Sequence, residues 1–598
     1  MVCWGYASSE VRQFTYLRHV KVFNLSSCIK LILITLSYDF LLSYAHSIFT
    51  DLIMKFFLLL LASVFIALGW LLPIHYRPWV TYTGELFAFL SLFALAAIYL
   101  KDKIKLPVIS LPLLFLASVP LLQYFCGELF FFDKALLCLL FVFGFWLCSV
   151  LGYNLTQNKF DREKIFIGFS TVVLLSGTLT GIIAICQWLT LDAYIPGMVN
   201  MQNAVRPYAN FAQPNNMATF LIMSLLGCLY LYEKQKIKTW ILSLCTFILI
   251  LAVALSQSRT SWVACLCILV YGAYQQYKGL ITLKWYYTLA WLALFIGLIA
   301  LLPIATQWIG QVTNVDIAQT KTAAERATGD MSRLAIWEQM LHAILDRPWW
   351  GYGWNQTSVA YTLVSDHFQG PVWIRSAHNF ILDFVLWNGL LIGIPFLAYF
   401  GYWGYQLNKH VNSVESVIGI LMIGAVLVHA MLEFPQYYAY FLLPVGFILG
   451  LVQSQQFNIK TITLSPNYMR GLYVVSLLLL GLIIRDYSVA AAKLNQSIRY
   501  EKTPEKITNQ KPIYLLEEFD RRIAWIRMSP YTKLNQQELN EIREMVLNYP
   551  TKYDLIKYAK ALAFNGHEKE ARHQLWLLKK LGKMDLDYAS LAQPISKK

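Results

Sequence analysis

Residues 285–305 read WYYTLAWLALFIGLIALLPIA and contain no charged side chain. A helix that crosses a bilayer needs about 20 mainly apolar residues, so this stretch is long enough to span a membrane. From Met54 onward the same character returns in residues 55–75, 84–100, 106–126, 133–152, 165–189, 217–233, 239–256, 260–277, 379–404, 414–432, 437–453 and 470–487. We therefore predict an all-α polytopic membrane protein with about 13 transmembrane helices.

The composition of the whole chain agrees with this pattern. Of 598 residues, 57% are hydrophobic and only 14% are charged, against about 25% charged in soluble domains. The net charge of +15 is a surplus that membrane proteins collect in cytoplasmic loops, so we expect no nucleic acid as partner. Most of the ten cysteines lie in apolar runs, which fits helix interfaces better than disulfides or a zinc site.

The positive charges also predict an orientation. The loops at 101–105, 159–164 and 234–238 each carry three Lys or Arg, whereas loops on the opposite side carry single ones such as Arg77. Because cytoplasmic loops are enriched in Lys and Arg, the Met54 end is predicted to be cytoplasmic. The long loop at about 306–377 and the tail then lie on the non-cytoplasmic side.

Three parts of the chain are expected. Residues 1–53 fit the orientation badly, and we interpret them as an extension upstream of the native start; the alternative is a real extra helix. Residues 54–489 are predicted to be the transmembrane domain. Residues 490–598 are more polar, with helical periodicity, and predict a helical domain that is either tetratricopeptide-like or without repeats.

Two polar segments on the non-cytoplasmic side are candidates for binding. QPNN at 213–216 precedes a span; Asn215 or Asn216 can cap that helix, or Gln213 and its neighbours can bind a sugar. SQSRTSW at 256–262 is a tight turn around Arg259. This arginine can reach lipid headgroups, or it can bind phosphate, since a guanidinium matches phosphate oxygens.

Two further segments flank the end of the long loop. SRLAIWEQMLHAIL at 332–345 predicts an amphipathic interfacial helix. Arg333 lies in its first turn, where the helix dipole disfavours a cation unless an anion binds there. RSAHNFILD at 375–383 puts His378 at the membrane boundary near Arg375. A lone histidine is most often structural, but this one is exposed.

His429 and Glu433 are four residues apart on one helical face and can pair. Together, the four segments and this pair combine arginines, a histidine, amides and aromatics on one side of the membrane. They suit a substrate with an anionic group at the bilayer surface and a polyhydroxyl part beyond it, such as a polyprenyl-pyrophosphate-linked glycan. The sequence has no P-loop, HExxH or GxSxG, which disfavours nucleotide-driven transport and metalloprotease chemistry.

Several motifs resemble a known superfamily. HNFIL at 378–382 followed by GLLIG at 389–393 is similar to the signature of O-antigen ligases, O-antigen polymerases and O-oligosaccharyltransferases. QPNN at 213–216 and EFPQYYAYFL at 433–442 resemble the bacterial protein O-oligosaccharyltransferase branch. The resemblance covers roughly residues 54–490, and the tail is similar to the helical tails of that branch.

The resemblance implies a GT-C-like fold in the bacterial inner membrane, with the active site facing the periplasm. It implies en bloc transfer of a glycan from undecaprenyl pyrophosphate to Ser or Thr of periplasmic proteins, pilin-like or other. No cofactor, nucleotide sugar or metal is expected.

The resemblance also assigns residues. His378 matches the residue taken to act on the acceptor hydroxyl, and Arg259 and Arg333 match arginines taken to hold the pyrophosphate, to which we add Arg375. Gln213 and one of Tyr437 and Tyr438 match further residues of the branch. The residues expected to bind substrate are Gln213, Asn215, Glu433, Tyr437 and Tyr438.

The chemistry favours a single displacement with inversion, in which arginines stabilise the leaving group and neutral His378 is the base. Asp383 is five residues from His378, off its helical face, and is not assigned as its partner. The closest alternative is the same chemistry with another acceptor: ligation to lipid A-core or O-antigen polymerisation. A lipid-linked glycan flippase is a remote one, because no internal repeat is evident.

Overall fold

The fold was analysed in a computed structural model. It describes residues 51–74, 78–201, 206–211, 213–313, 332–368, 373–456, 458–501 and 503–591. The chain divides into two compact units, Met1–Leu58 and Leu59–Lys598, and the features discussed below lie in the second. The interpretation of residues 1–53 falls almost entirely outside the described residues.

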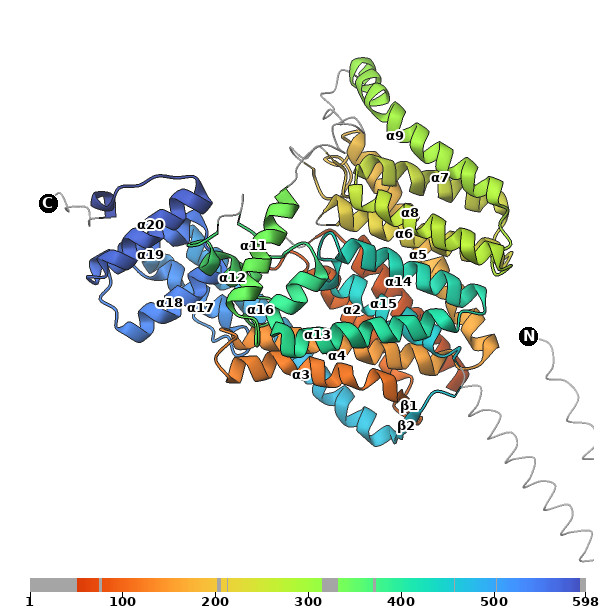
Figure 1. Ribbon diagram of the computed structural model, residues 1–598, viewed down its shortest axis with the longest axis horizontal. Coiled ribbons are helices and arrows are strands. Elements are labelled where there is room, and N and C mark those ends of the chain that lie inside the picture. The colour runs from red at the N-terminus through yellow and green to blue at the C-terminus, as the bar shows by residue number, and fades with distance from the viewer. Residues whose placement is uncertain are drawn as a thin grey trace, which may run out of the picture. The chain divides into compact units, whose positions relative to one another are not determined.

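Every predicted span coincides with a helix, which confirms the all-α polytopic class (Figure 1). The helices are Asp51–Leu71, α2 Tyr82–Ala97, α3 Pro112–Phe125, α4 Phe132–Leu155, α5 Lys159–Trp188, α6 Pro214–Glu233, α7 Thr239–Ser256, α8 Arg259–Tyr277, α9 Trp285–Thr313, α13 Phe380–Lys409, α14 Val414–Ala430, α15 Ala439–Gln453 and α16 Pro466–Arg499. Within the described part of the chain, nine helices are long and apolar enough to cross a membrane, and α2, α14 and α15 are shorter apolar helices.

One small sheet departs from an all-helical chain. Strand β1, Ile104–Pro107, pairs antiparallel with β2, Thr461–Leu464. The pairing joins the segment before α3 to the segment before α16, more than half the chain away.

Helices α4 and α15 pack closely because small residues let their backbones approach. A Cβ on Gly450 would collide with the carbonyl oxygen of Ser149, and a Cβ on Gly152 would collide with that of Phe447. This contact holds α15, and the turn before it, at a fixed depth in the bundle.

We expect Gly450→Ala to destabilise the protein by about 1–3 kcal/mol, since the added methyl overpacks a buried contact. Gly424→Ala in α14 is the control, because a Cβ there meets nothing within 4 Å. The measurement is the temperature at which the detergent-purified protein loses its monodisperse elution peak. Equal melting of the two variants would contradict the packing argument.

The long loop contains two helices, α11 Ser332–Asp346 and α12 Thr357–Val364. The predicted amphipathic helix is confirmed as α11, with Ile336 and Met340 buried and Leu334 and Leu345 exposed. Its exposed face therefore carries leucines beside Glu338 and His342, which fits a helix at a membrane interface.

The segment after α11 is held by a break in α13. Gly389 has φ +64° and ψ −177°, so α13 loses its helical hydrogen bonds there. The freed carbonyls of Leu386 and Trp387 accept hydrogen bonds from the backbone N–H groups of Tyr352 (2.9 Å) and Gly353 (3.1 Å). Because no room exists for a side chain at Gly389, this glycine fixes the loop onto α13.

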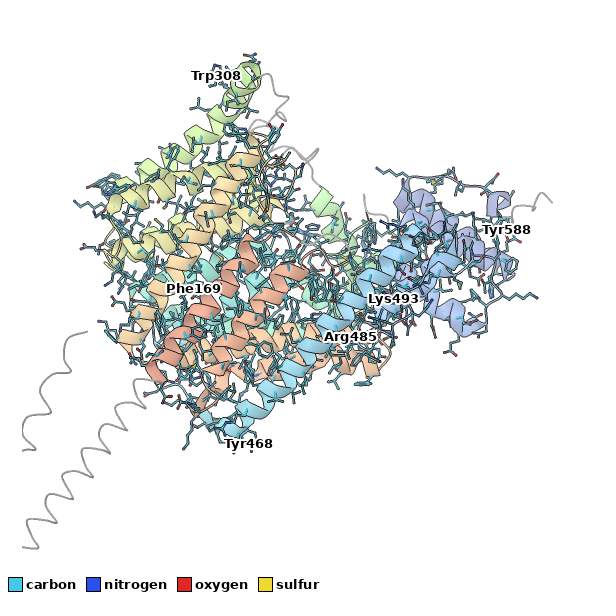
Figure 2. The ribbon with its side chains drawn as sticks, turned by 180° about the vertical axis from the view of Figure 1, so that it is seen from behind. Phe169, Trp308, Tyr468, Arg485, Lys493 and Tyr588 are labelled. Carbon is cyan, nitrogen blue, oxygen red and sulfur yellow. The ribbon has the colours of Figure 1, made fainter. Side chains whose placement is uncertain are left out.

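The tail forms helices α17 Glu517–Arg527, α18 Gln536–Asn548, α19 Lys552–Phe564 and α20 Glu568–Gly582. Figure 1 shows them gathered beyond α11 and α12. Helix α16 leads toward them without a break from Tyr468 past Lys493 (Figure 2). Hydrogen bonds from Lys134 Nζ to Asn548 Oδ1 (2.7 Å) and from the Phe132 N–H to Glu517 (3.1 Å) attach these helices to α4.

Candidate active site

Glu433 is the centre of a polar cluster between the helices. It follows α14 and precedes the 3-10 helix η2, Pro435–Tyr437, and its side chain is only 6% exposed. Its Oε1 forms an ion pair with Arg333 of α11, and its Oε2 lies 2.7 Å from Nδ1 of His378, just before α13. Three segments far apart in the sequence therefore meet at one carboxylate.

Two amides from the start of α6 complete the cluster. Asn215 Nδ2 donates to Glu433 Oε1 at 3.0 Å, and Gln213 Nε2 donates to Glu433 Oε2 at 3.4 Å. The capping interpretation of Asn215 and Asn216 is wrong, because α6 begins at Pro214 with Gln213 at its N-cap and has no side-chain cap. Asn215 instead donates to the carboxylate of Glu433, as Gln213 does.

The charge of Glu433 decides which ring nitrogen of His378 carries the hydrogen in their contact. Burial alone would raise the pKa of Glu433, but the hydrogen bond of His378 and the charges of His378 and Arg333 hold it below its ordinary value. Glu433 is thus an anion that can only accept, so the hydrogen in this contact is carried by Nδ1 of His378. In the neutral ring Nε2 is then the hydrogen-bond acceptor, and a general base needs this tautomer.

The backbone at His378 is unusual. Its φ of +52° lies in the left-handed region, which costs a non-glycine residue about 1 kcal/mol or more. The next residue, Asn379, caps α13 by accepting the Leu382 N–H and donates to the Met431 carbonyl at 3.3 Å. The ring of Phe434 packs edge-on to the imidazole at 5.2 Å.

Sequence reasoning did not assign Asp383 as the partner of His378, and in the structure Asp383 holds the backbone before His378 rather than its ring. It is fully buried and accepts hydrogen bonds from the Ala377 N–H (2.9 Å), Ser376 Oγ (2.5 Å), Thr357 Oγ1 (2.7 Å) and Tyr437 OH (3.4 Å). Ser376 Oγ in turn accepts the His378 N–H at 3.0 Å. A carboxylate inside a membrane helix was the signal that could have found it.

Arg206 was also missing from the candidate residues. Its Nε donates to the Ser256 carbonyl at 2.7 Å and its Nη2 to Asn215 Oδ1 at 3.3 Å. It therefore connects the amide segment to the α7–α8 turn. Arg259 is the first residue of α8 in that turn, after Ser258, whose hydroxyl accepts the Ser261 N–H.

The remaining candidates lie in different surroundings. Arg375 is not in the Glu433 cluster: its guanidinium lies over the rings of Tyr549, 4.4 Å away in the C-terminal helices, and Trp373. Tyr437 reaches Asp383, whereas the ring of Tyr438 stacks on Tyr440 at 5.3 Å.

His429 does not form the expected side-chain pair with Glu433. It is completely buried, and its Nδ1 lies 2.9 Å from Thr219 Oγ1. In the described residues no group of three or more His, Cys, Asp or Glu side chains is arranged to hold a metal ion. The cluster instead combines an anion, a histidine with one free nitrogen, two arginine-bearing segments and two amides.

The chain is similar to two protein families and to individual proteins of known name. Residues 244–397 match the O-antigen ligase family, and residues 417–580 match the C-terminal region of virulence factor membrane-bound polymerases. The chain is 40% identical to a general O-oligosaccharyltransferase of Acinetobacter baylyi over 548 residues, which cover 92% of this chain and 96% of that protein. It is 30% identical to a ComP-specific O-oligosaccharyltransferase of the same species, over 63% of this chain and 67% of that protein.

The fold and the matched regions define a membrane-embedded glycosyltransferase of the O-antigen ligase class. Within this class, the chain belongs to the O-oligosaccharyltransferase family. The resemblance that the sequence motifs indicated is confirmed.

Proposed function

We propose that this protein transfers a preassembled glycan from undecaprenyl pyrophosphate to Ser or Thr hydroxyls of periplasmic proteins, working in the bacterial inner membrane with its site toward the periplasm. The observation that carries the proposal is the bond between His378 Nδ1 and Glu433 Oε2. It leaves Nε2 available to accept the proton of an alcohol. The names of the two relatives support a protein as acceptor.

The arginines are suited to the donor. Pyrophosphate leaves with its bonding electron pair, and preorganised guanidinium groups stabilise the charge that develops on it. The side chain of Arg333 is 25% exposed, and it can exchange Glu433 for an anion of higher charge, such as a pyrophosphate. Arg206, which donates to Asn215 and to the Ser256 carbonyl, and Arg259, in the same α7–α8 turn as Ser256, are proposed to extend the cationic surface. Arg375, bound to the C-terminal helices, is proposed to act at its edge.

The reaction is proposed as one displacement. The hydroxyl oxygen of the acceptor attacks the anomeric carbon and forms the new C–O bond, while the bond from that carbon to the pyrophosphate oxygen breaks. The hydroxyl proton moves to Nε2 of His378, whose positive charge Glu433 stabilises. Undecaprenyl pyrophosphate departs as the anion, and the anomeric centre inverts. Gln213, Asn215, Tyr437 and Tyr438 are proposed to hydrogen-bond the sugar.

The experiment that tests the proposal is deletion of the gene in its own bacterium, with glycoproteins and lipopolysaccharide analysed from the same cells. We expect protein-linked glycans to disappear and to return with the wild-type gene, while lipopolysaccharide stays unchanged. Altered lipopolysaccharide with intact glycoproteins would overturn the protein acceptor and leave the family assignment standing.

Asp383→Asn tests the support beneath His378. An amide nitrogen cannot accept the hydrogen bonds that the carboxylate accepts, so the peptide carrying His378 loses its anchor. We expect kcat to fall about 10²-fold, the effect of a small displacement of a catalytic group, with KM for the donor nearly unchanged. Asp366→Asn, an exposed carboxylate paired with His573, is the control. Equal kcat in both variants would refute the role of Asp383.

A further inference from the structure

The His378 segment, residues 373–378, joins the long loop to α13 and ends at the proposed base. Its last residues are held by the membrane domain: the Ala377 N–H donates to Asp383 of α13, and the Ala377 carbonyl accepts a hydrogen bond from Trp337 Nε1 of α11 at 3.0 Å. The contacts of its first residues lead to α18, among the C-terminal helices. The segment is therefore supported from two sides.

The first contact with α18 runs through a buried hydroxyl. Trp373 Nε1 donates to Ser358 Oγ at 2.8 Å, and Ser358 Oγ donates to the Leu547 carbonyl at 3.1 Å. Ser358 belongs to α12, is 5% exposed, and lies on the helix that packs against α18 (Figure 1). Because one hydroxyl makes both hydrogen bonds, the indole of Trp373 is fixed relative to the end of α18.

The second contact is an aromatic ring with a cation at each of two places. Tyr549 is the C-cap residue of α18. The guanidinium carbon of Arg375 lies 4.4 Å from the centre of its ring, and Nζ of Lys134, from the start of α4, lies 5.1 Å away. Aromatic faces attract guanidinium and ammonium groups. The ring of Tyr549 therefore holds Arg375, three residues before His378.

The C-terminal helices are themselves fixed to the membrane domain, because α4 and α17 cap each other. Asp133 Oδ2 accepts the Glu518 N–H at 3.2 Å, and Glu517 Oε2 accepts the Phe132 N–H at 3.1 Å. The first N–H groups of a helix have no partner within it, so each carboxylate satisfies one of them. Tyr549 is thus carried by a bundle whose position is set by the start of α4.

We propose that Tyr549 is a positioning residue for the transfer reaction. By holding Arg375, its ring keeps the His378 segment in the arrangement in which Nδ1 of His378 meets Glu433. The positive φ of His378 is unfavourable and persists only where the surroundings impose it. Asp383 supplies one constraint, and the C-terminal helices supply the second. The inference rests on the proposed function for the role of His378, but not for the support itself.

The test compares Tyr549→Leu, which removes the aromatic face, with Tyr549→Phe, which retains it. Hydrogen–deuterium exchange of the full-length protein in detergent is measured over the His378 segment, together with kcat for transfer. In Tyr549→Leu we expect exchange there to rise about fivefold and kcat to fall about fivefold, the factor that corresponds to one exposed cation–π contact. Tyr549→Phe should behave as the wild type in both measurements.

Tyr553→Leu is the matched control. Its ring faces Arg522 at 5.8 Å, and its hydroxyl donates to Glu501, so it makes the same kind of contact within the C-terminal helices. It should change neither quantity. Arg375→Met removes the contact from its exposed side and should raise exchange as Tyr549→Leu does, so the proposal stays testable if Tyr549→Leu fails to fold.

Combining the two changes separates positioning from a loss of stability. If the ring acts through Arg375, adding Tyr549→Leu to Arg375→Met lowers kcat no further. Unchanged exchange or unchanged kcat in Tyr549→Leu, equal changes in Tyr553→Leu, or additive losses in the double variant would each overturn the proposal. A wild type that transfers no glycan to protein would instead contradict the proposed function, and the exchange measurement would still decide whether Tyr549 supports the segment.

Discussion

His378→Ala will reduce the rate of glycan transfer by about 10²–10⁴-fold, the range that a positioned general base contributes. The imidazole is 26% exposed and bonded through Nδ1 to Glu433, so alanine removes the base and leaves the buried carboxylate bound to Arg333. The donor should still bind, because the arginines proposed to hold its pyrophosphate are unchanged. The measurement is single-turnover transfer by detergent-purified protein, with donor binding measured separately.

The matched control for this variant is His342→Ala. His342 lies in α11, the helix that carries Arg333, but its ring stacks on Phe368 and makes no contact with Glu433. Its replacement should leave transfer within a factor of about two, as for most surface changes. A wild-type rate of transfer in His378→Ala would contradict the role of His378 as the general base.

Glu433→Gln is the second variant with a large expected effect. Glutamine keeps the volume but presents an N–H where the carboxylate accepts from Arg333, His378 and Asn215. The imidazole loses the partner that fixes its tautomer, a change that costs about 10⁴-fold in catalytic triads of similar geometry. The control is Glu128→Gln, a 40% exposed carboxylate on Arg347, where an exposed ion pair contributes little. Comparable rates in the two variants would contradict the central position of Glu433.

Glu433 also gives a pH dependence with a definite sign. Its pKa is lower in the folded protein than its ordinary value of 4.5. The stabilisation from its ion pairs is therefore complete above that value and is lost as the pH falls through the lower folded pKa. The free energy of unfolding should therefore fall less on acidification in Glu433→Gln than in the wild type. Identical acid profiles would show that the charge of Glu433 does not stabilise the fold.

The spans were predictable because each is a local property of 17 or more consecutive residues that are mainly apolar. The candidate segments were predictable as a group because polar residues at membrane boundaries are few, and the positive charges assign their side. His378, Arg333, Gln213, Asn215 and Glu433 meet as this grouping suggested.

Their pairing was not predictable. Helical spacing relates residues within one helix, and it suggested His429 as the partner of Glu433, yet the actual partners Arg333 and Asn215 are 100 and 218 residues away. The spacing argument that set Asp383 aside was also incomplete, because Asp383 acts on the backbone of Ala377 and His378 rather than on the imidazole. Arg375 is drawn away by an aromatic ring in a separate part of the chain, which no local pattern shows.

The most direct measurement is reconstituted transfer with the purified protein, a synthetic undecaprenyl-pyrophosphate-linked glycan and a purified periplasmic acceptor protein, without nucleotide. The proposed function predicts an acceptor whose mass increases by one whole glycan on a Ser or Thr, with undecaprenyl pyrophosphate released in equal amount. An unmodified acceptor beside a glycosylated lipid A-core offered in the same reaction would contradict it.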